Sequence, residues 1–323
     1  MIAFLFPGQA SQSVGMGKAW ANESKIAASY FERANETLGR DLRKLCFEGP
    51  EEELTNTRNA QPAIYTVSCI AGRLLFDAGL VPDYVAGNSI GEYAALYFAR
   101  TFDFETGLQL IQERADAMAE AGEARPGTMA AVILMEPEDI EKALEELRAE
   151  GGIISIAGLN SPGQTVISGS VETIEKAIPF LKGKGAKRVL PLSVSGAFHS
   201  ELMRPAKERF EKALRKVALR KPSTLFVSNY DAKPVTEAEK LYEDLPNLLT
   251  SPVRWTEILA FMKDQGCQAY VEAGPGKVLS GLLKKFDENA PCAVLSDLDS
   301  IEKTAEEFHP FLCGLRKDYA DLV

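Results

Sequence analysis

Histidine is scarce in this chain: His199 and His309 are the only two among 323 residues. The five cysteines are odd in number, scattered, and form no C-x-x-C pair. This usage speaks against a zinc site or a disulfide framework and favours reduced thiols in a cytoplasmic protein. Chemistry that requires an imidazole base therefore has two candidates.

Long apolar runs and an excess of positive charge are also missing. No stretch approaches the roughly 20 apolar residues of a membrane helix, and residues 1–8 lack the basic start of a signal peptide. The formal net charge of -10 argues against nucleic-acid binding, because phosphate recognition requires a positive surface. These absences predict a globular protein that binds neither nucleic acid nor membrane, and a monomer is the simplest expectation.

Short apolar segments alternate with helical stretches, which is the pattern of an α/β fold. Between Gly127 and Gly196 the order becomes β-α-β-β-α-β, the ferredoxin-like unit. We therefore expect a larger α/β domain from residues 1–126 and 197–323, with a ferredoxin-like insert at 127–196. Strands are expected at 2–6, 84–86, 128–135, 153–157, 165–168, 188–194, 225–228, 269–272 and 293–296, and helices at 23–38, 61–78, 90–99, 103–121, 138–148 and 171–181.

The segment Gly87-Asn88-Ser89-Ile90-Gly91 matches G-x-S-x-G, between an expected strand and an expected helix. This context is typical of a nucleophile elbow, a tight turn that holds a serine at a helix N-terminus. Side chains two residues either side of the serine would collide in such a turn, which explains both glycines. Free N–H groups at the helix terminus favour developing negative charge. The pattern also occurs by chance, but in this context it makes Ser89 the candidate nucleophile.

A serine nucleophile needs a base. His309 lies in Glu306-Glu307-Phe308-His309-Pro310, in an expected charged C-terminal helix, where a solvated surface histidine is the better interpretation. His199 follows the last expected strand of the insert, in a loop, where catalytic side chains are often presented. A lone histidine is more often structural, but Ser89 has no other candidate base, which favours His199.

Gln9 follows the first expected strand, within Phe6-Pro7-Gly8-Gln9. An N–H group there could complete an oxyanion hole with the N–H of Ile90, the residue after the nucleophile. The alternative is a glycine-rich loop that merely turns the chain. The glycines at 8, 15 and 17 lack G-x-G-x-x-G spacing and predict no dinucleotide site.

Taken together, the motifs resemble the malonyl-CoA:acyl-carrier-protein transacylase family, and in detail its free-standing, trans-acting polyketide synthase members. A fatty-acid enzyme of the same family is the alternative. The matches run in the family's order along nearly the whole chain. They are Phe6-Pro7-Gly8-Gln9, Gln61-Pro62-Ala63, Gly87-Asn88-Ser89-Ile90-Gly91-Glu92-Tyr93, Gln112-Glu113-Arg114, Asn160-Ser161-Pro162-Gly163-Gln164, Ala197-Phe198-His199-Ser200, Ser251-Pro252-Val253-Arg254-Trp255 and Glu272-Ala273-Gly274-Pro275-Gly276-Lys277-Val278-Leu279.

The resemblance implies a hydrolase-like parallel-sheet domain with a ferredoxin-like insert, and a ping-pong reaction. Ser89 would carry a malonyl or related carboxyacyl group taken from CoA, with His199 as base and later acid. Gln9 and the Ile90 N–H would form the oxyanion hole, and Arg114 would hold the free carboxylate of the acyl group. The partners would be malonyl-CoA and the phosphopantetheine thiol of an acyl carrier protein, and no metal or redox cofactor would be required.

Two positions depart from the family's usual pattern. Asn88 stands immediately before the nucleophile, where the family usually has histidine, and Leu248 stands where glutamine is common. In the family, the backbone carbonyl at the position of Leu248 orients the histidine, so leucine is compatible with catalysis. Asn88, Leu248, Phe198 and Asn160 are the candidates for lining the acyl pocket, and they bear on which acyl group is carried.

Two other functions fit parts of the same pattern. An editing hydrolase would use the same acyl-Ser89 intermediate and release it to water, although relatives of that kind tend to lose the carboxylate clamp that Arg114 would form. A non-catalytic scaffold that binds carrier protein is the other alternative, for which Ser89, His199 and Gln9 together are hard to explain.

Overall fold

A computed structural model describes residues 1–194 and 196–312 of the chain. The strands are β1 (Ile2–Phe6), β2 (Tyr84–Gly87), β3 (Gly127–Ile133), β4 (Ile154–Ser161), β5 (Gln164–Ser170), β6 (Arg188–Pro191), β7 (Leu225–Val227), β8 (Pro234–Val235), β9 (Ala269–Glu272) and β10 (Cys292–Val294). The α-helices are α1 (Lys18–Glu23), α2 (Lys25–Leu38), α3 (Leu42–Glu48), α4 (Glu51–Thr55), α5 (Thr57–Asp77), α6 (Gly91–Phe98), α7 (Phe104–Ala124), α8 (Pro137–Ala149), α9 (Val171–Gly183), α10 (Arg204–Leu214), α11 (Ala238–Leu248), α12 (Trp255–Asp264), α13 (Val278–Phe286) and α14 (Leu298–Phe308). Two short 3₁₀ helices are η1 (Glu201–Met203) and η2 (His309–Phe311).

The larger sheet has six strands in the order β10-β9-β1-β2-β7-β8, all parallel except the short β8 at one edge. Its central strand β1 is buried along its whole length, because helices cover both faces. Phe4 and Phe6 belong to the core shared with α2, α5, α6 and α7. Ala3 and Leu5 point to the other face and pack with residues of α12 and α13. The predicted parallel α/β fold is confirmed.

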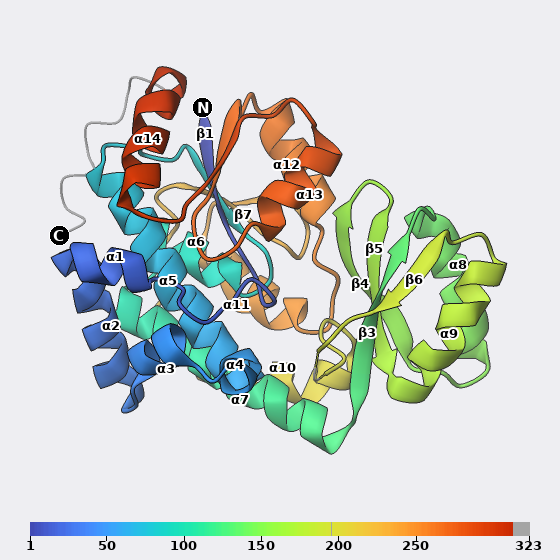
Figure 1. The fold of residues 1–323 in the computed structure, drawn as a ribbon. Helices are drawn as coiled ribbons and strands as arrows, with labels where there is room; N and C mark the ends of the chain where they lie inside the picture. Colours follow the sequence, from blue (N-terminus) through green and yellow to red (C-terminus); the bar gives the residue numbers. More distant parts are fainter. Residues whose placement is uncertain (195, 313–323) are drawn as a thin grey trace.

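The second sheet has four antiparallel strands in the order β4-β5-β3-β6, and it lies beside the larger one (Figure 1). The chain order β3-α8-β4-β5-α9-β6 is the predicted ferredoxin-like order. One face carries its own core, in which Ala130 and Val132 pack with residues of α8 and α9. Side chains alternate between the two faces of a strand, so Met129 points to the face opposite Ala130 and joins the core of the larger part. That residues 127–196 form a separate inserted domain stays a prediction. The separate core on one face of this sheet supports it.

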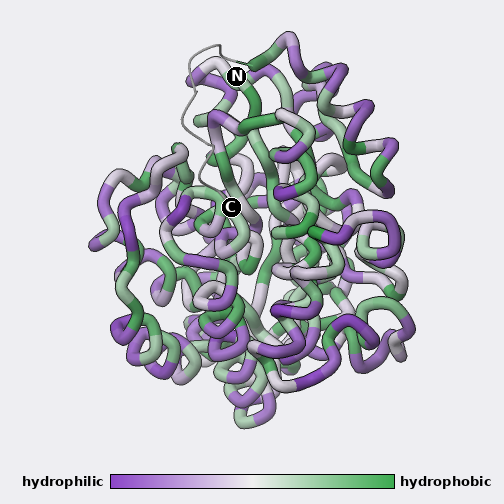
Figure 2. The backbone as a smooth tube through the Cα atoms, turned by 90° about the vertical axis from the view of Figure 1, so that its left-hand side faces the viewer, coloured by the Kyte–Doolittle hydropathy of each residue, from purple (hydrophilic) through white to green (hydrophobic). Residues whose placement is uncertain are grey.

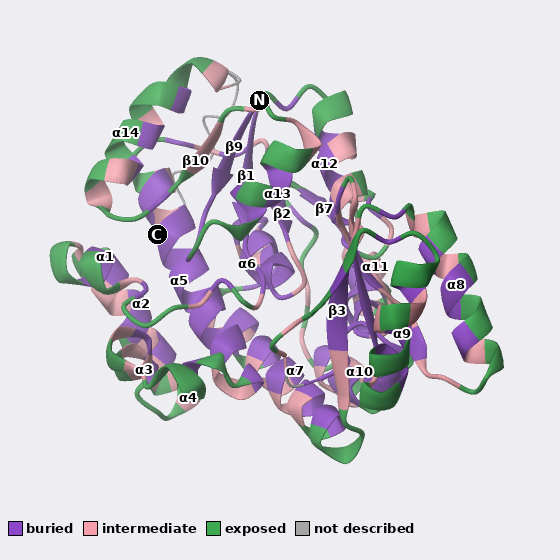
Figure 3. Cartoon of the chain, turned by 45° about the vertical axis from the view of Figure 1, so that its right-hand side comes forward, coloured by how far each residue is buried: buried purple, intermediate pink, exposed green. Residues whose placement is uncertain are grey.

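Apolar segments concentrate toward the interior and hydrophilic ones toward the periphery (Figure 2). The strands β1, β2 and β9 and helix α6 are buried, whereas α1, α4 and α14 each expose one face (Figure 3). Among the described helices, none combines the length and apolar composition needed to cross a membrane.

Helix α5 begins four residues before the predicted start at Gln61. Asn56 accepts from the Arg58 N–H and caps this earlier start, which places Pro62 inside the helix and not in its first turn, where proline is favoured. Since Pro62 has no N–H for the carbonyl of Arg58, that carbonyl accepts instead from Arg40 Nη2 at 3.0 Å.

Candidate active site

Ser89 lies in the turn between β2 and α6. Its φ angle is 53°, in the left-handed region that non-glycine residues rarely occupy. A Cβ atom on Gly87 would lie 1.9 Å from the carbonyl carbon of Gly91, and one on Gly91 would lie 2.1 Å from the carbonyl oxygen of Phe6. Both glycines of the motif are therefore required by the close approach of neighbouring backbone segments.

His199 contacts this serine directly. Its Nε2 atom lies 2.8 Å from Ser89 Oγ, and its Nδ1 atom lies 2.8 Å from the carbonyl oxygen of Leu248. Because a carbonyl only accepts hydrogen bonds, Nδ1 carries the hydrogen, and Nε2 is the acceptor for the serine hydroxyl. Burial, and secondarily the Arg114 cation, lowers the pKa of His199 to about 4. The ring is therefore neutral at physiological pH and able to accept a proton from Ser89.

Arg114 is the second group on the serine. It projects from α7, is 1% exposed, and donates from Nη2 to Ser89 Oγ at 3.0 Å and from Nη1 to Gln61 Oε1 at 2.6 Å. Its guanidinium carbon lies 5.9 Å from the centroid of the Tyr93 ring. Burial lowers the pKa of Arg114, whereas Tyr93 and Glu92 raise it. No carboxylate of the described residues forms an ion pair with it.

Gln9 and Ile90 supply the candidate oxyanion donors. Gln9 lines the cavity at Ser89, and its side-chain Nε2 donates to Thr57 Oγ1 at 3.2 Å. Ile90 is the N-cap residue of α6. The first N–H groups of a helix have no acceptor within it, so α6 itself provides no partner for the Ile90 N–H. The Ile90 side chain faces away and packs with Ala60 and Ile64.

The cavity at Ser89 has a volume of about 160 Å³ and lies between the two sheets. The structure brings Gln9, Ser89, Arg114 and His199 together in it. The predicted pocket residues Asn88, Phe198 and Asn160 also line it, whereas Leu248 takes part through its carbonyl group. The remaining lining is apolar or backbone: Ala10, Met118, Met129, Ala157, Gly158, Val166, Leu192, Val194 and Val253. Within residues 1–194 and 196–312, no cluster of side chains suits a metal ion.

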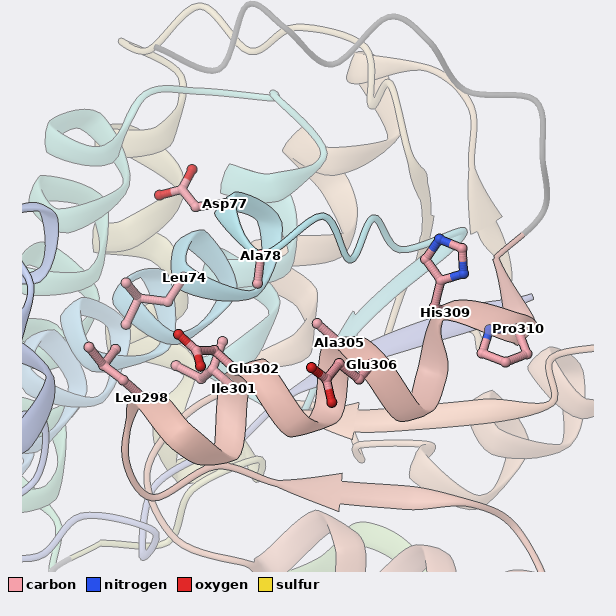
Figure 4. A pocket seen from close by; sticks show the side chains of 10 residues that line it. All are labelled: Leu74, Asp77, Ala78, Leu298, Ile301, Glu302, Ala305, Glu306, His309 and Pro310. Carbon is pink, nitrogen blue, oxygen red and sulfur yellow. The ribbon is translucent and has the colours of Figure 1, made fainter.

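His309 lies in a different pocket, between α5 and the segment formed by α14 and η2 (Figure 4). That pocket shares no lining residue with the cavity at Ser89. His309 is exposed, and Glu302 and Glu306 line the same pocket. The prediction of a solvated surface histidine is confirmed for this residue.

Three buried polar residues of the site had no role in the sequence prediction. Gln61 accepts from Arg114, and Glu92 and Asn229 form hydrogen bonds around the nucleophile turn. Gln61 and Glu92 stood within the recognised motifs, but their partners are distant in sequence. Asn229 follows the end of β7 beside β2, and the carboxyl ends of neighbouring parallel strands are where such residues gather.

Comparison with known proteins agrees with this geometry. The acyl transferase domain family matches residues 3–312. The chain belongs to this acyl transferase family. It is 42% identical over 301 residues to the malonyl CoA-acyl carrier protein transacylase of Bacillus subtilis (strain 168), covering 93% of this chain and 95% of that protein.

Two further relatives of this acyl transferase connect the family to carrier proteins. The polyketide biosynthesis malonyl CoA-acyl carrier protein transacylase PksC of Bacillus subtilis (strain 168) is 40% identical over 292 residues, covering 91% of this chain and 98% of that protein. A malonyl-transacylase solved in complex with a type II polyketide synthase acyl-carrier protein has a TM-score of 0.90 and 38% identity, covering 95% of this chain and 99% of that chain.

Proposed function

We propose that this acyl transferase moves a malonyl group from CoA to the phosphopantetheine thiol of an acyl carrier protein, for polyketide or fatty-acid synthesis. Ser89 Oγ attacks the thioester carbonyl carbon while its proton passes to His199 Nε2. The C–S bond then breaks, and His199 returns the proton to the departing CoA sulfur. In the second half, the carrier thiol gives its proton to His199, attacks the acyl-Ser89 ester and releases Ser89 with its proton restored.

The oxyanion that forms in each half-reaction needs fixed donors. We assign this role to the backbone N–H groups of Ile90 and Gln9, because Ile90 begins α6 and Gln9 lines the same cavity. Donors of this kind act strongly in a site from which water is excluded.

The CoA thioester supplies the activated acyl group in this scheme, and we propose that the reaction requires no cofactor. The free thiols of Cys46, Cys69, Cys267 and Cys292 support a cytoplasmic location.

The buried, unpaired guanidinium of Arg114 is the observation that carries the choice of a carboxyacyl substrate. An arginine that is 1% exposed has lost most of its hydration, and burial of an unpaired charge is unfavourable. A carboxylate on the acyl group would supply the missing counter-charge through a bidentate contact. The distance of 3.0 Å from Nη2 to Ser89 Oγ fits a short acyl group such as malonyl.

The proposal is tested by mixing the protein with malonyl-CoA and a phosphopantetheinylated carrier protein and measuring malonyl-carrier and free malonate. We expect malonyl-carrier as the main product. Rapid release of malonate without malonyl-carrier would instead establish the editing hydrolase. Neither product, together with carrier binding, would establish a scaffold.

The pH dependence follows from the His199 environment. Its pKa is lowered to about 4, so the base stays unprotonated as the pH falls through the range in which a free histidine titrates. We expect the rate of Ser89 acylation to stay level from about pH 7 to about pH 5 and to fall only below that. Stopped-flow release of CoA at saturating malonyl-CoA measures this rate. An acid limb near the ordinary histidine pKa would contradict the assigned environment.

Gln61→Glu tests the carboxylate clamp without touching Ser89 or His199. The new carboxylate would lie where Gln61 Oε1 now accepts from Arg114 at 2.6 Å and would neutralise the guanidinium. We expect kcat/KM for malonyl-CoA to fall on the order of 10- to 100-fold, with little change for acetyl-CoA. Gln265→Glu, at an exposed position, is the matched control. Equal losses for both donors would show that Gln61 serves only the fold.

A further inference from the structure

The nucleophile turn is held by one buried side chain from a neighbouring strand. Asn229, which is fully buried, follows β7, and β7 is parallel to β2. Its Oδ1 atom accepts from the Ser89 N–H at 2.7 Å, and its Nδ2 atom donates to the Gly87 carbonyl at 2.7 Å. One carboxamide therefore satisfies backbone groups on both sides of residue 88.

This pair of bonds reproduces the pattern of a parallel ladder. In a parallel sheet, one residue donates to the carbonyl of the residue before its partner and accepts from the N–H of the residue after it. The backbone ladder between β2 and β7 ends at Val85 and Phe226. Beyond it, the Asn229 side chain makes the two bonds that a strand residue opposite Asn88 would make. On the other side, the Asn88 N–H donates to the carbonyl of Phe6 at the end of β1.

Asn229 is itself held in place by a residue of α6. Its backbone N–H donates to Glu92 Oε1 at 2.6 Å, and Glu92 is 1% exposed in the first turn of α6. The contact ties the helix after the nucleophile to the loop after β7. Three elements, β2, α6 and the β7 loop, are thereby fixed around Ser89.

We propose that Asn229 is a positioning residue for Ser89, holding the left-handed turn so that Oγ stays aligned with His199 Nε2. The inference rests on the proposed role of Ser89 as nucleophile. A φ angle of 53° at Ser89 is unfavourable for a side-chain-bearing residue, so the surroundings must enforce it. The bond from the Ser89 N–H to Asn229 also removes that N–H from the oxyanion donors and leaves the N–H of Ile90.

Asn229→Asp tests this role through a pH profile. An ionised carboxylate at this position can accept from the Ser89 N–H but cannot donate to the Gly87 carbonyl, whereas a protonated carboxyl group can do both. At about pH 8 we expect the kcat of acylation to fall on the order of 10- to 100-fold, with KM for malonyl-CoA little changed. The deficit relative to the unmodified protein should shrink as the pH falls toward about 5, because the buried carboxyl group takes up its proton there.

The other titrating groups near the turn do not obscure this profile. Burial raises the pKa of Glu92 to about 8 despite the hydrogen bond from the Asn229 N–H, which lowers it; Asp244 and Asp231 also raise this pKa and Arg114 lowers it. These groups are present in both proteins. Lys240 pairs with both aspartates. The pKa of His199 at about 4 leaves the base active throughout the range.

Asn229→Ser provides a second variant, because its short, neutral side chain leaves both bonds unmade at every pH. We expect a deficit of similar size that does not recover in acid. Asn289→Asp, at an exposed position, makes the same chemical change elsewhere and should act like the unmodified protein. Acylation by both position-229 variants at the unmodified rate, or an Asn229→Asp deficit independent of pH, would overturn the inference. Absence of any acyl adduct in the unmodified protein would instead refute the proposed function.

Discussion

Ser89→Ala should abolish the covalent malonyl intermediate and lower transfer to the carrier protein by at least about 10⁴-fold. The hydroxyl is the only nucleophile of the described residues held between the His199 imidazole and the Arg114 guanidinium, at 2.8 Å and 3.0 Å. Without it the thioester has no group to attack it. Intact-mass measurement after incubation with malonyl-CoA detects the adduct, and a coupled assay measures transfer.

Ser13→Ala is a suitable control for this variant, since Ser13 is exposed and lies outside the cavity at Ser89. It should retain both the adduct and the transfer rate. A malonyl adduct of undiminished amount on the Ser89→Ala protein would show that another residue carries the acyl group.

Arg114→Ala should change which acyl group is carried. Loss of the buried guanidinium removes the partner of the malonyl carboxylate, and we expect kcat/KM for malonyl-CoA to fall on the order of 10²- to 10³-fold. Acetyl-CoA has no carboxylate, so its transfer should be equal or faster. The cavity also becomes less polar, which favours an uncharged acyl group. A panel of acyl-CoA donors scored for the adduct on Ser89 measures the change.

Arg114→Lys separates charge from geometry at the same position. Lysine keeps the positive charge but lacks the planar pair of donors that contacts Ser89 and Gln61 together. Malonyl transfer should lie between that of the unmodified protein and that of Arg114→Ala. Equal loss of malonyl and acetyl transfer in Arg114→Ala would contradict the clamp and indicate a general role in shaping the site.

Local patterns of the sequence predict much of the fold. Ile2–Phe6 is a continuous apolar run because β1 is covered on both faces, and such runs identify buried parallel strands. Boundaries were less predictable. Helix α5 starts four residues before the predicted residue because Asn56 caps it there. The Arg58 carbonyl, which Pro62 leaves without a helical donor, accepts instead from Arg40, and nothing near Pro62 in the sequence signals that contact.

In the site, too, local features were predictable from the sequence and long-range contacts were not. The G-x-S-x-G spacing indicated the turn at Ser89 because local backbone crowding requires both glycines. The scarcity of histidine left His199 as the candidate base. The role of Asn229 was not predictable from the sequence, because its bonds to Ser89 and Gly87 span 140 and 142 residues. Only the pairing of β7 with β2 brings it there, and strand pairing is not encoded in either strand alone.

The central claim is that Ser89 holds an ester that a carrier thiol, and not water, resolves. The protein can be loaded with radiolabelled malonyl-CoA, freed of CoA and then mixed with phosphopantetheinylated carrier protein in a rapid-quench experiment. The account predicts that label leaves Ser89 and appears on the carrier far faster than it is lost to buffer alone. Label that leaves as free malonate at the same rate with or without carrier would contradict it.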